Sequence, residues 1–249
     1  MMSPFFIKKC KKAIKMENGI TKISVYGDSI LKGAVTGTDS GNLFDVLDEN
    51  GLSLAAKSLG FELNNQSVFG NIVTKGKRKL SREIERGVVF DCAIIESGGN
   101  DCDYDWNIVC ESPFEFHNPR VSLEDFIKTI DEMVNICRQN KITPLLMTMP
   151  PLVEDWWFTH LCESFNEQGV REFTKNIPSV LYQNHEIYNF AILDYCRVHN
   201  VQFVDMRFEI LKTGHYRDLM CRDGIHPNWE GHKFMATVWE KELPKVKKE

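Results

Sequence analysis

The chain lacks long apolar runs, clustered cysteines and an excess of positive charge, and each absence excludes a class of protein. No apolar stretch approaches the roughly 18 residues that a membrane-spanning helix needs, so we expect no integral membrane contact. The formal net charge is -5, whereas nucleic-acid-binding domains are usually basic, so we expect no nucleic-acid partner. The 249 residues are 43% hydrophobic and 26% charged, which is ordinary for a globular domain with a sizeable core.

The eight cysteines are scattered through apolar segments, and no two have the CxxC spacing of zinc-binding or redox motifs. This pattern is typical of small buried thiols in a reducing compartment. We therefore expect a cytoplasmic protein without a metal site.

The N-terminal segment is basic, with five lysines interleaved with apolar residues before position 16. Its longest apolar run is residues 5–7, whereas a secretory signal has roughly 7–15 apolar residues, so no signal peptide is expected. We predict a loosely held arm over residues 1–19, followed by a single domain over 20–249. A weak membrane-surface helix is the alternative for the arm.

Short apolar runs alternate with longer amphipathic stretches along the chain. The runs predict strands at 22–27, 62–68, 91–97, 142–149 and 201–206. The amphipathic stretches predict helices at 72–87, 122–139, 178–199 and 228–243. This alternation indicates an α/β fold of parallel strands, whose functional site lies at the carboxyl ends of the strands. We expect two further stretches, 98–121 and 150–177, to be long irregular loops at that edge.

Three short motifs follow predicted strands. Ser29 ends the sequence GDS after the first strand, where a serine is either a nucleophile or an ordinary turn residue. Gly70 follows the second strand, and Asn100 in SGGND follows the third. Both can offer an N–H group to an oxyanion, and both are also common in turns.

A fourth motif, DGIHP, precedes the last predicted helix. Asp223 and His226 stand three residues apart in it, so the carboxylate can orient the imidazole for proton transfer. Pro227 is expected at the first helical position, which would place His226 at the helix cap. Each of the four motifs is ambiguous alone, but together and in this order they predict a hydrolytic site.

In these residues the chain resembles the SGNH (GDSL-type) hydrolase superfamily, whose four name-giving residues match Ser29, Gly70, Asn100 and His226. The resemblance covers about residues 20–243. It implies a three-layer α/β/α flavodoxin-like fold with a mainly parallel five-stranded sheet. It also implies ester hydrolysis without a metal or another cofactor.

The resemblance further implies a role for each matched residue. Ser29 would be the nucleophile, His226 the general base, and Asp223 the residue that orients the imidazole. The oxyanion would be met by the backbone N–H groups of Ser29 and Gly70 and by the side-chain amide of Asn100. Our leading hypothesis is hydrolysis of small acyl esters, in particular acetyl esters and including those of carbohydrates, through an acyl-enzyme. The alternatives are a lysophospholipase- or thioesterase-like hydrolase of longer acyl chains and a non-catalytic flavodoxin-like binding module.

Further residues are expected around this site. Asp28 is predicted to support the nucleophile turn by capping backbone N–H groups. Trp106, Trp156 and Trp157 are candidate substrate-binding residues because aromatic faces stack on sugars or line acyl pockets. The acidic stretch 100–116 lacks the glycine and the glutamate of a calcium loop, so we expect it to bind no metal. The sequence leaves the oligomeric state open.

Overall fold

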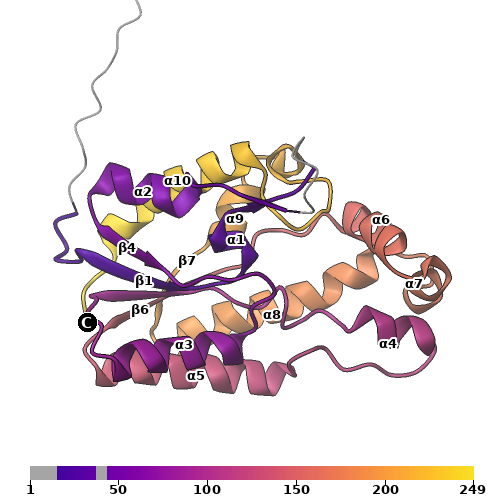
Figure 1. Cartoon of the computed structure of the whole chain (residues 1–249), viewed down its shortest axis with the longest axis horizontal. Helices are drawn as coiled ribbons and strands as arrows, with labels where there is room; N and C mark the ends of the chain where they lie inside the picture. The colour runs from indigo at the N-terminus through magenta and orange to yellow at the C-terminus, as the bar shows by residue number, and fades with distance from the viewer. Residues whose placement is uncertain (1–15, 38–43) are drawn as a thin grey trace, which may run out of the picture.

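The computed structural model describes residues 16–37 and 44–249. Its centre is a five-stranded parallel sheet with the order β4-β1-β5-β6-β7 (Figure 1). The strands are β1 (Lys22–Tyr26), β4 (Glu62–Asn65), β5 (Cys92–Ile95), β6 (Thr143–Met147) and β7 (Gln202–Val204). All five lie within the predicted runs, so the predicted α/β fold is confirmed. Most of the predicted N-terminal arm lies outside the described residues.

Helices cover both faces of the sheet (Figure 1). One face carries α2 (Gly51–Leu59), α9 (Met206–Leu211) and α10 (Trp229–Glu242), and the other carries α3 (Val73–Glu85), α5 (Leu123–Gln139) and α8 (Ser179–Val198). The four predicted helices are thus present as α3, α5, α8 and α10. Helices α2 and α9 are additional, and both are too short to give a clear helical period in the sequence. The smaller described elements are α1 (Ser29–Lys32), the strand pair β2 (Ala34–Val35) and β3 (Asp45–Val46), and two 3-10 turns, η1 (Tyr216–Leu219) and η2 (Leu243–Lys245).

Successive side chains of the central strands enter opposite faces of the sheet, and this builds two cores. Ile94 and Leu145 belong to the core under α2 and α10. Their neighbours Ile95 and Leu146 belong to the core under α3, α5 and α8. Strands that are buried on both faces read as continuous apolar runs, which is why the sequence predicts them so well.

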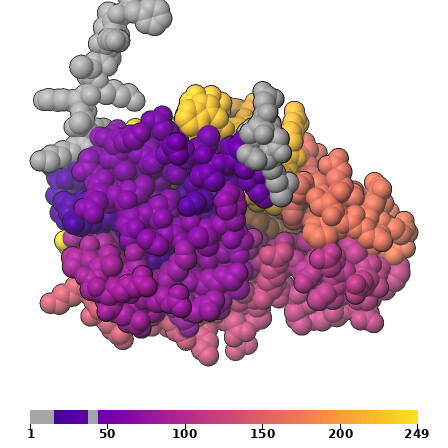
Figure 2. Space-filling view, viewed as in Figure 1, coloured from indigo at the N-terminus to yellow at the C-terminus, as the bar shows by residue number. Residues whose placement is uncertain are grey.

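The stretches 98–121 and 150–177 are not the long irregular loops that we expected. They contain α4 (Trp106–Glu111), α6 (Glu154–Ser164) and α7 (Glu167–Thr174). These helices form a lobe beside the sheet, at the right of Figures 1 and 2. The lobe has a small core of its own, which α4, α6 and α7 build together with the start of α8. The prediction was wrong there, because none of these helices is longer than 11 residues and each buries only a few residues.

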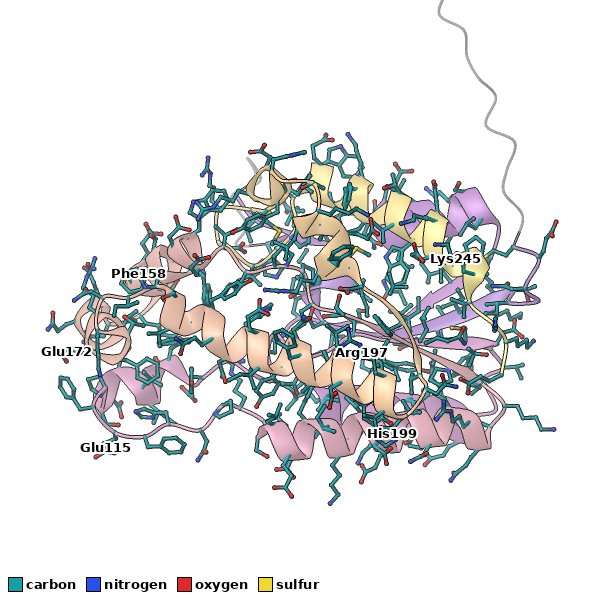
Figure 3. All side chains as sticks on the ribbon, turned by 180° about the vertical axis from the view of Figure 1, so that it is seen from behind. Glu115, Phe158, Glu172, Arg197, His199 and Lys245 are labelled. Carbon is teal, nitrogen blue, oxygen red and sulfur yellow. The ribbon has the colours of Figure 1, made fainter. Side chains whose placement is uncertain are left out.

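Helix α8 connects the lobe to the main body. Its first turns contribute Leu181 to the core of the lobe, and its later turns contribute Tyr188 and Ile192 to the core under the sheet. In Figure 3, Phe158 and Glu172 mark the lobe, whereas His199 marks the opposite end of α8. The middle of α8 therefore lies where the lobe meets the sheet. Within the described part of the chain, no helix is long and apolar enough to cross a membrane.

Candidate active site

The strand order reverses between β1 and β5. After β1 the chain forms β4 on one side of it and then β5 on the other side. Ligands of open parallel sheets bind outside the carboxyl ends of the strands at such a reversal point. Ser29 follows β1 and Asn100 follows β5, so the topology brings these two residues to one place.

His226 lies between Ser29 and Asp223. Its Nε2 is 2.8 Å from the Ser29 Oγ, and its Nδ1 is 2.6 Å from the Asp223 Oδ2. Burial opposes ionisation of Asp223, but the hydrogen bond and the charge of His226 hold the pKa of this carboxyl below its usual range. An ionised carboxylate only accepts, so the Nδ1 carries the hydrogen and the Nε2 is free to take the Ser29 proton. This arrangement can activate a serine for attack on a carbonyl.

The loop around Gly224 holds Asp223 and His226 in this geometry. The Asp223 Oδ1 accepts the backbone N–H groups of Ile225 and His226 at 3.0 and 3.1 Å. Gly224 has a φ of 79°, and its carbonyl oxygen accepts the N–H of Val153 at 2.8 Å. A Cβ atom at Gly224 would lie 2.5 Å from the Val153 oxygen. A glycine is therefore needed for both the backbone conformation and the close approach of the lobe.

The last helix begins later than predicted. Helix α10 begins at Trp229 and is capped by Asn228, whereas Pro227 pairs with Met220 in an isolated bridge. His226 is therefore not at the helix cap. Its place is set by the hydrogen bonds of the preceding loop, which no helix signal encodes.

The predicted oxyanion donors line the same cavity as Ser29. One N–H of the Asn100 amide donates to the Asp28 Oδ2 at 2.9 Å, which leaves the second N–H of that amide for a ligand. Gly70 has a φ of 61°, and its backbone N–H has no hydrogen-bond partner within residues 16–37 and 44–249. Together with the N–H of Ser29, these groups can form an oxyanion hole.

A buried pair of carboxyl groups, Asp28 and Glu96, lies beneath the turn that carries Ser29. Asp28 caps α1 as predicted, because its Oδ1 accepts the N–H of Ile30 at 2.8 Å. The backbone N–H of Asp28 donates in turn to the Glu96 Oε2 at 3.0 Å. Burial and the charge of Asp28 hold the pKa of Glu96 well above its usual range, which favours its protonated form. Glu96 was not among the residues predicted from the sequence. An acid directly after the buried run CAII does indicate a buried carboxyl group that needs a partner.

A cavity of about 330 Å³ opens at these residues. Trp157 contributes to its wall and is half-buried. Trp106 also contributes, but it is only 2% exposed and donates its indole N–H to Asp103 at 2.9 Å. Trp156 is not part of the lining, and its ring lies under the Arg222 guanidinium at 4.4 Å. Of the three predicted tryptophans, Trp157 thus has the geometry that best suits contact with a substrate.

Carboxylates of the acidic stretch 100–116 accept hydrogen bonds from backbone N–H groups of the protein. Asp101 accepts the N–H groups of Val73 and Gly98 at 2.9 and 3.0 Å, and Asp105 caps α4. Within the described residues, no group of three or more His, Cys, Asp or Glu side chains could hold a metal ion.

Comparison with known proteins identifies the family of this chain. The profile of the GDSL-like Lipase/Acylhydrolase family matches residues 25–234. The chain belongs to this family. As a GDSL-family protein it is a carboxylic ester hydrolase. A comparison with curated protein sequences finds no match.

Solved structures of GDSL-type proteins share the fold at low sequence identity. A lipase/acylhydrolase from Enterococcus faecalis is 16% identical, with a TM-score of 0.60 over 92% of this chain and 99% of that one. A catalytic mutant of an acetylxylan esterase from Geobacillus stearothermophilus is 20% identical, with a TM-score of 0.61 over 93% and 96%. A lipolytic G-D-S-L family protein from Veillonella parvula is 13% identical, with a TM-score of 0.60 over 91% and 100%. This chain therefore has the SGNH hydrolase fold over almost its full length.

Proposed function

We propose that this GDSL-family hydrolase cleaves small acyl esters, in the first place acetyl esters of carbohydrates, through an acyl-enzyme on Ser29. The observation that carries the proposal is the 2.8 Å distance between the Ser29 Oγ and the His226 Nε2, with Asp223 behind the imidazole. A non-catalytic binding module would not need this chain of three groups.

The mechanism follows from which groups donate and which accept. The Ser29 Oγ attacks the ester carbonyl while the His226 Nε2 takes its proton, and His226 then protonates the leaving alcohol. Asp223 stabilises the imidazolium that forms between these two transfers. The negative charge on the carbonyl oxygen is met by the N–H groups of Ser29 and Gly70 and by the free N–H of Asn100. Water then attacks the acyl-enzyme in the same way and releases the acid.

Two observations support a sugar ester as the substrate. The rings of Trp157 and His160 are stacked at 5.4 Å, and both residues line the cavity. Stacked aromatic rings at a cavity wall suit the flat faces of a sugar. One of the solved structures that share the fold, at 20% identity, is an acetylxylan esterase.

A second candidate, a hydrolase of longer acyl chains, is favoured by the apolar part of the cavity wall. This part includes Ile30, Phe44, Phe69, Met149, Leu152 and Leu181. An apolar wall binds hydrocarbon chains through the surface that they remove from water.

Steady-state kinetics with a series of p-nitrophenyl esters from acetate to decanoate, beside acetylated xylose and glucose, tests the proposal. Hydrolysis that is fastest at acetate and that extends to the acetylated sugars supports it. A maximum at longer chains supports the second candidate instead. The proposed function is contradicted if no ester is hydrolysed and a fluorophosphonate does not label Ser29, with Ser29→Ala as the control.

A further inference from the structure

His185 lies on α8 and contributes to the wall of the cavity that contains Ser29. Its side chain is buried, and it has no part in the proposed chemistry at Ser29. The groups that contact its ring determine which ring nitrogen carries the hydrogen, and so whether the ring offers the cavity a donor or an acceptor.

A buried arginine fixes the hydrogen of the His185 ring. The Arg207 Nη1 lies 3.3 Å from the His185 Nδ1 and 3.2 Å from the carbonyl oxygen of Pro150. A guanidinium only donates hydrogen bonds, so the Nδ1 accepts and the hydrogen of the neutral ring sits on the Nε2. Burial and the charge of Arg207 lower the pKa of His185 to about 3, which keeps the ring neutral at physiological pH.

Arg207 itself is firmly held. It is 4% exposed, forms an ion pair with Glu186 and donates to the Tyr182 hydroxyl at 2.6 Å. Moving it would leave a buried charge without a partner, which is strongly unfavourable. The orientation of the His185 N–H is therefore built into the fold.

The Nε2 of His185 is available to a ligand. It has no hydrogen-bond partner among the residues that the structure describes. Some side-chain atoms of the described residues are fully enclosed and lack a partner, and the His185 Nε2 is not one of them. The Nε2 is therefore neither bonded nor enclosed, and the residue that carries it lines the cavity.

The neighbouring Asn184 offers the complementary group. Its Nδ2 donates to the carbonyl oxygen of Cys102, whereas its Oδ1 has no partner within residues 16–37 and 44–249. Asn184 also lines the cavity. The wall thus presents one donor and one acceptor from adjacent residues. A hydroxyl group can accept from the first or donate to the second, whereas a methylene group can do neither.

We propose that His185 and Asn184 form a subsite for a hydroxyl group of the substrate, so that the natural ester carries a hydroxyl on its alcohol or its acyl part. This inference rests on ester hydrolysis at Ser29 and assigns the recognition of a hydroxyl group on the ester to two named residues. A site built to hydrogen-bond a hydroxyl group discriminates strongly against the analogue that lacks it. The proposal therefore separates hydroxylated esters from plain hydrocarbon esters of the same size.

The test compares kcat/KM within two pairs of esters that differ by one hydroxyl group. The alcohol pair is 1,2-cyclohexanediol monoacetate and cyclohexyl acetate, and the acyl pair is p-nitrophenyl 3-hydroxybutyrate and p-nitrophenyl butyrate. The ratio within each pair is divided by the same ratio for alkaline hydrolysis, which removes intrinsic reactivity. We expect this corrected ratio to exceed 1 by about tenfold or more in at least one pair, the scale of one buried hydrogen bond. We expect His185→Phe or Asn184→Leu to bring it back toward 1.

His232→Asn is the matched control, because His232 is also a buried histidine with an unpartnered Nε2 but does not line the cavity. It should leave the corrected ratio unchanged. Corrected ratios near 1 in both pairs for the unmodified enzyme overturn the subsite without any variant. So does a high ratio that survives in both His185→Phe and Asn184→Leu. Absence of hydrolysis for all four esters contradicts the proposed function itself, so the two failures are distinguishable.

Discussion

Asn100 donates an amide hydrogen to the Asp28 Oδ2 across 2.9 Å, so the proposed oxyanion donor is held by the residue that precedes the proposed nucleophile. Asp28 also accepts from Ile30 in the turn that carries Ser29. The two ends of the site, after β1 and after β5, are thus joined by one carboxylate. Because the Asn100 amide is fixed before a substrate arrives, little reorganisation is needed when negative charge develops.

Asn100→Ala removes one oxyanion donor and should lower kcat about 10²–10³-fold with little change in KM. The comparison is Asn107→Ala on α4, which removes an exposed amide and should leave kcat unchanged. Steady-state kinetics on p-nitrophenyl acetate measure both. An Asn100→Ala enzyme with full kcat and a native melting temperature would show that its amide does not meet the oxyanion.

Ser29→Ala and His226→Ala should each nearly abolish ester hydrolysis while the protein remains folded. Asp223→Asn should cost about 10³–10⁴-fold in kcat, because the amide no longer favours the tautomer that leaves the His226 Nε2 free. His215→Ala, which removes an exposed histidine, is the control. Near-full activity in a folded Ser29→Ala or His226→Ala variant contradicts the assignment.

Glu96 is expected to act as a neutral acid that positions Asp28. Glu96→Gln keeps an acceptor for the Asp28 N–H and supplies an N–H to its carboxylate, so kcat should fall less than about threefold. Glu96→Leu fills the same space without polar groups and should lower kcat about 10–100-fold, because Asp28 loses buried partners. Circular dichroism and melting temperature establish that both variants fold. If Gln and Leu at this position behave alike, Glu96 has no positioning role.

Two buried histidines should make the protein less stable in acid. Burial lowers the pKa of His232 to about 4 and, together with the charge of Arg207, lowers that of His185 to about 3. Below pH 6.5, the usual value for histidine, the unfolded chain takes up protons that the folded chain does not. Each of the two histidines should therefore contribute a decrease in the free energy of unfolding as the pH drops from about 6.5 to 4.

His232→Asn tests this pH dependence. Asparagine keeps an acceptor for the Gly51 N–H but cannot be protonated, so between pH 7 and pH 4.5 the variant should lose about 2 kcal/mol less stability than the unmodified protein. Urea unfolding at pH 7 and at pH 4.5 gives the loss of stability for the variant and for the unmodified protein. Asp101, whose pKa burial raises to about 7, gives an opposite slope, but it is present in both proteins and cancels. Equal losses in the two proteins would show that His232 titrates normally.

The sequence predicts the sheet and the convergence of Ser29, Asn100 and His226, because the buried central strands are apolar runs and the topology brings the carboxyl ends of parallel strands to one edge. It does not predict the lobe, since α6 and α7 bury only a few residues each. It also does not predict the roles of Glu96 and His185. Their environments come from residues distant in the chain, as the 3.3 Å contact between His185 and Arg207 shows. Such long-range polar contacts leave no periodic trace in a sequence.

Gly224→Ala should damage both stability and activity, because this glycine joins the Asp223 and His226 loop to the lobe. At a φ of 79° an alanine is strained, and its Cβ would also lie 2.5 Å from the Val153 oxygen, so the loop must move. We expect a loss of about 1–3 kcal/mol in the free energy of unfolding and a fall in kcat.

Gly60→Ala separates the backbone strain from the steric contact. Gly60 has a similar φ of 76°, but a Cβ atom there would meet nothing within 4 Å, so the variant should lose stability and keep kcat. If Gly224→Ala loses no more activity than Gly60→Ala, the contact between loop and lobe does not hold Asp223 and His226 in place.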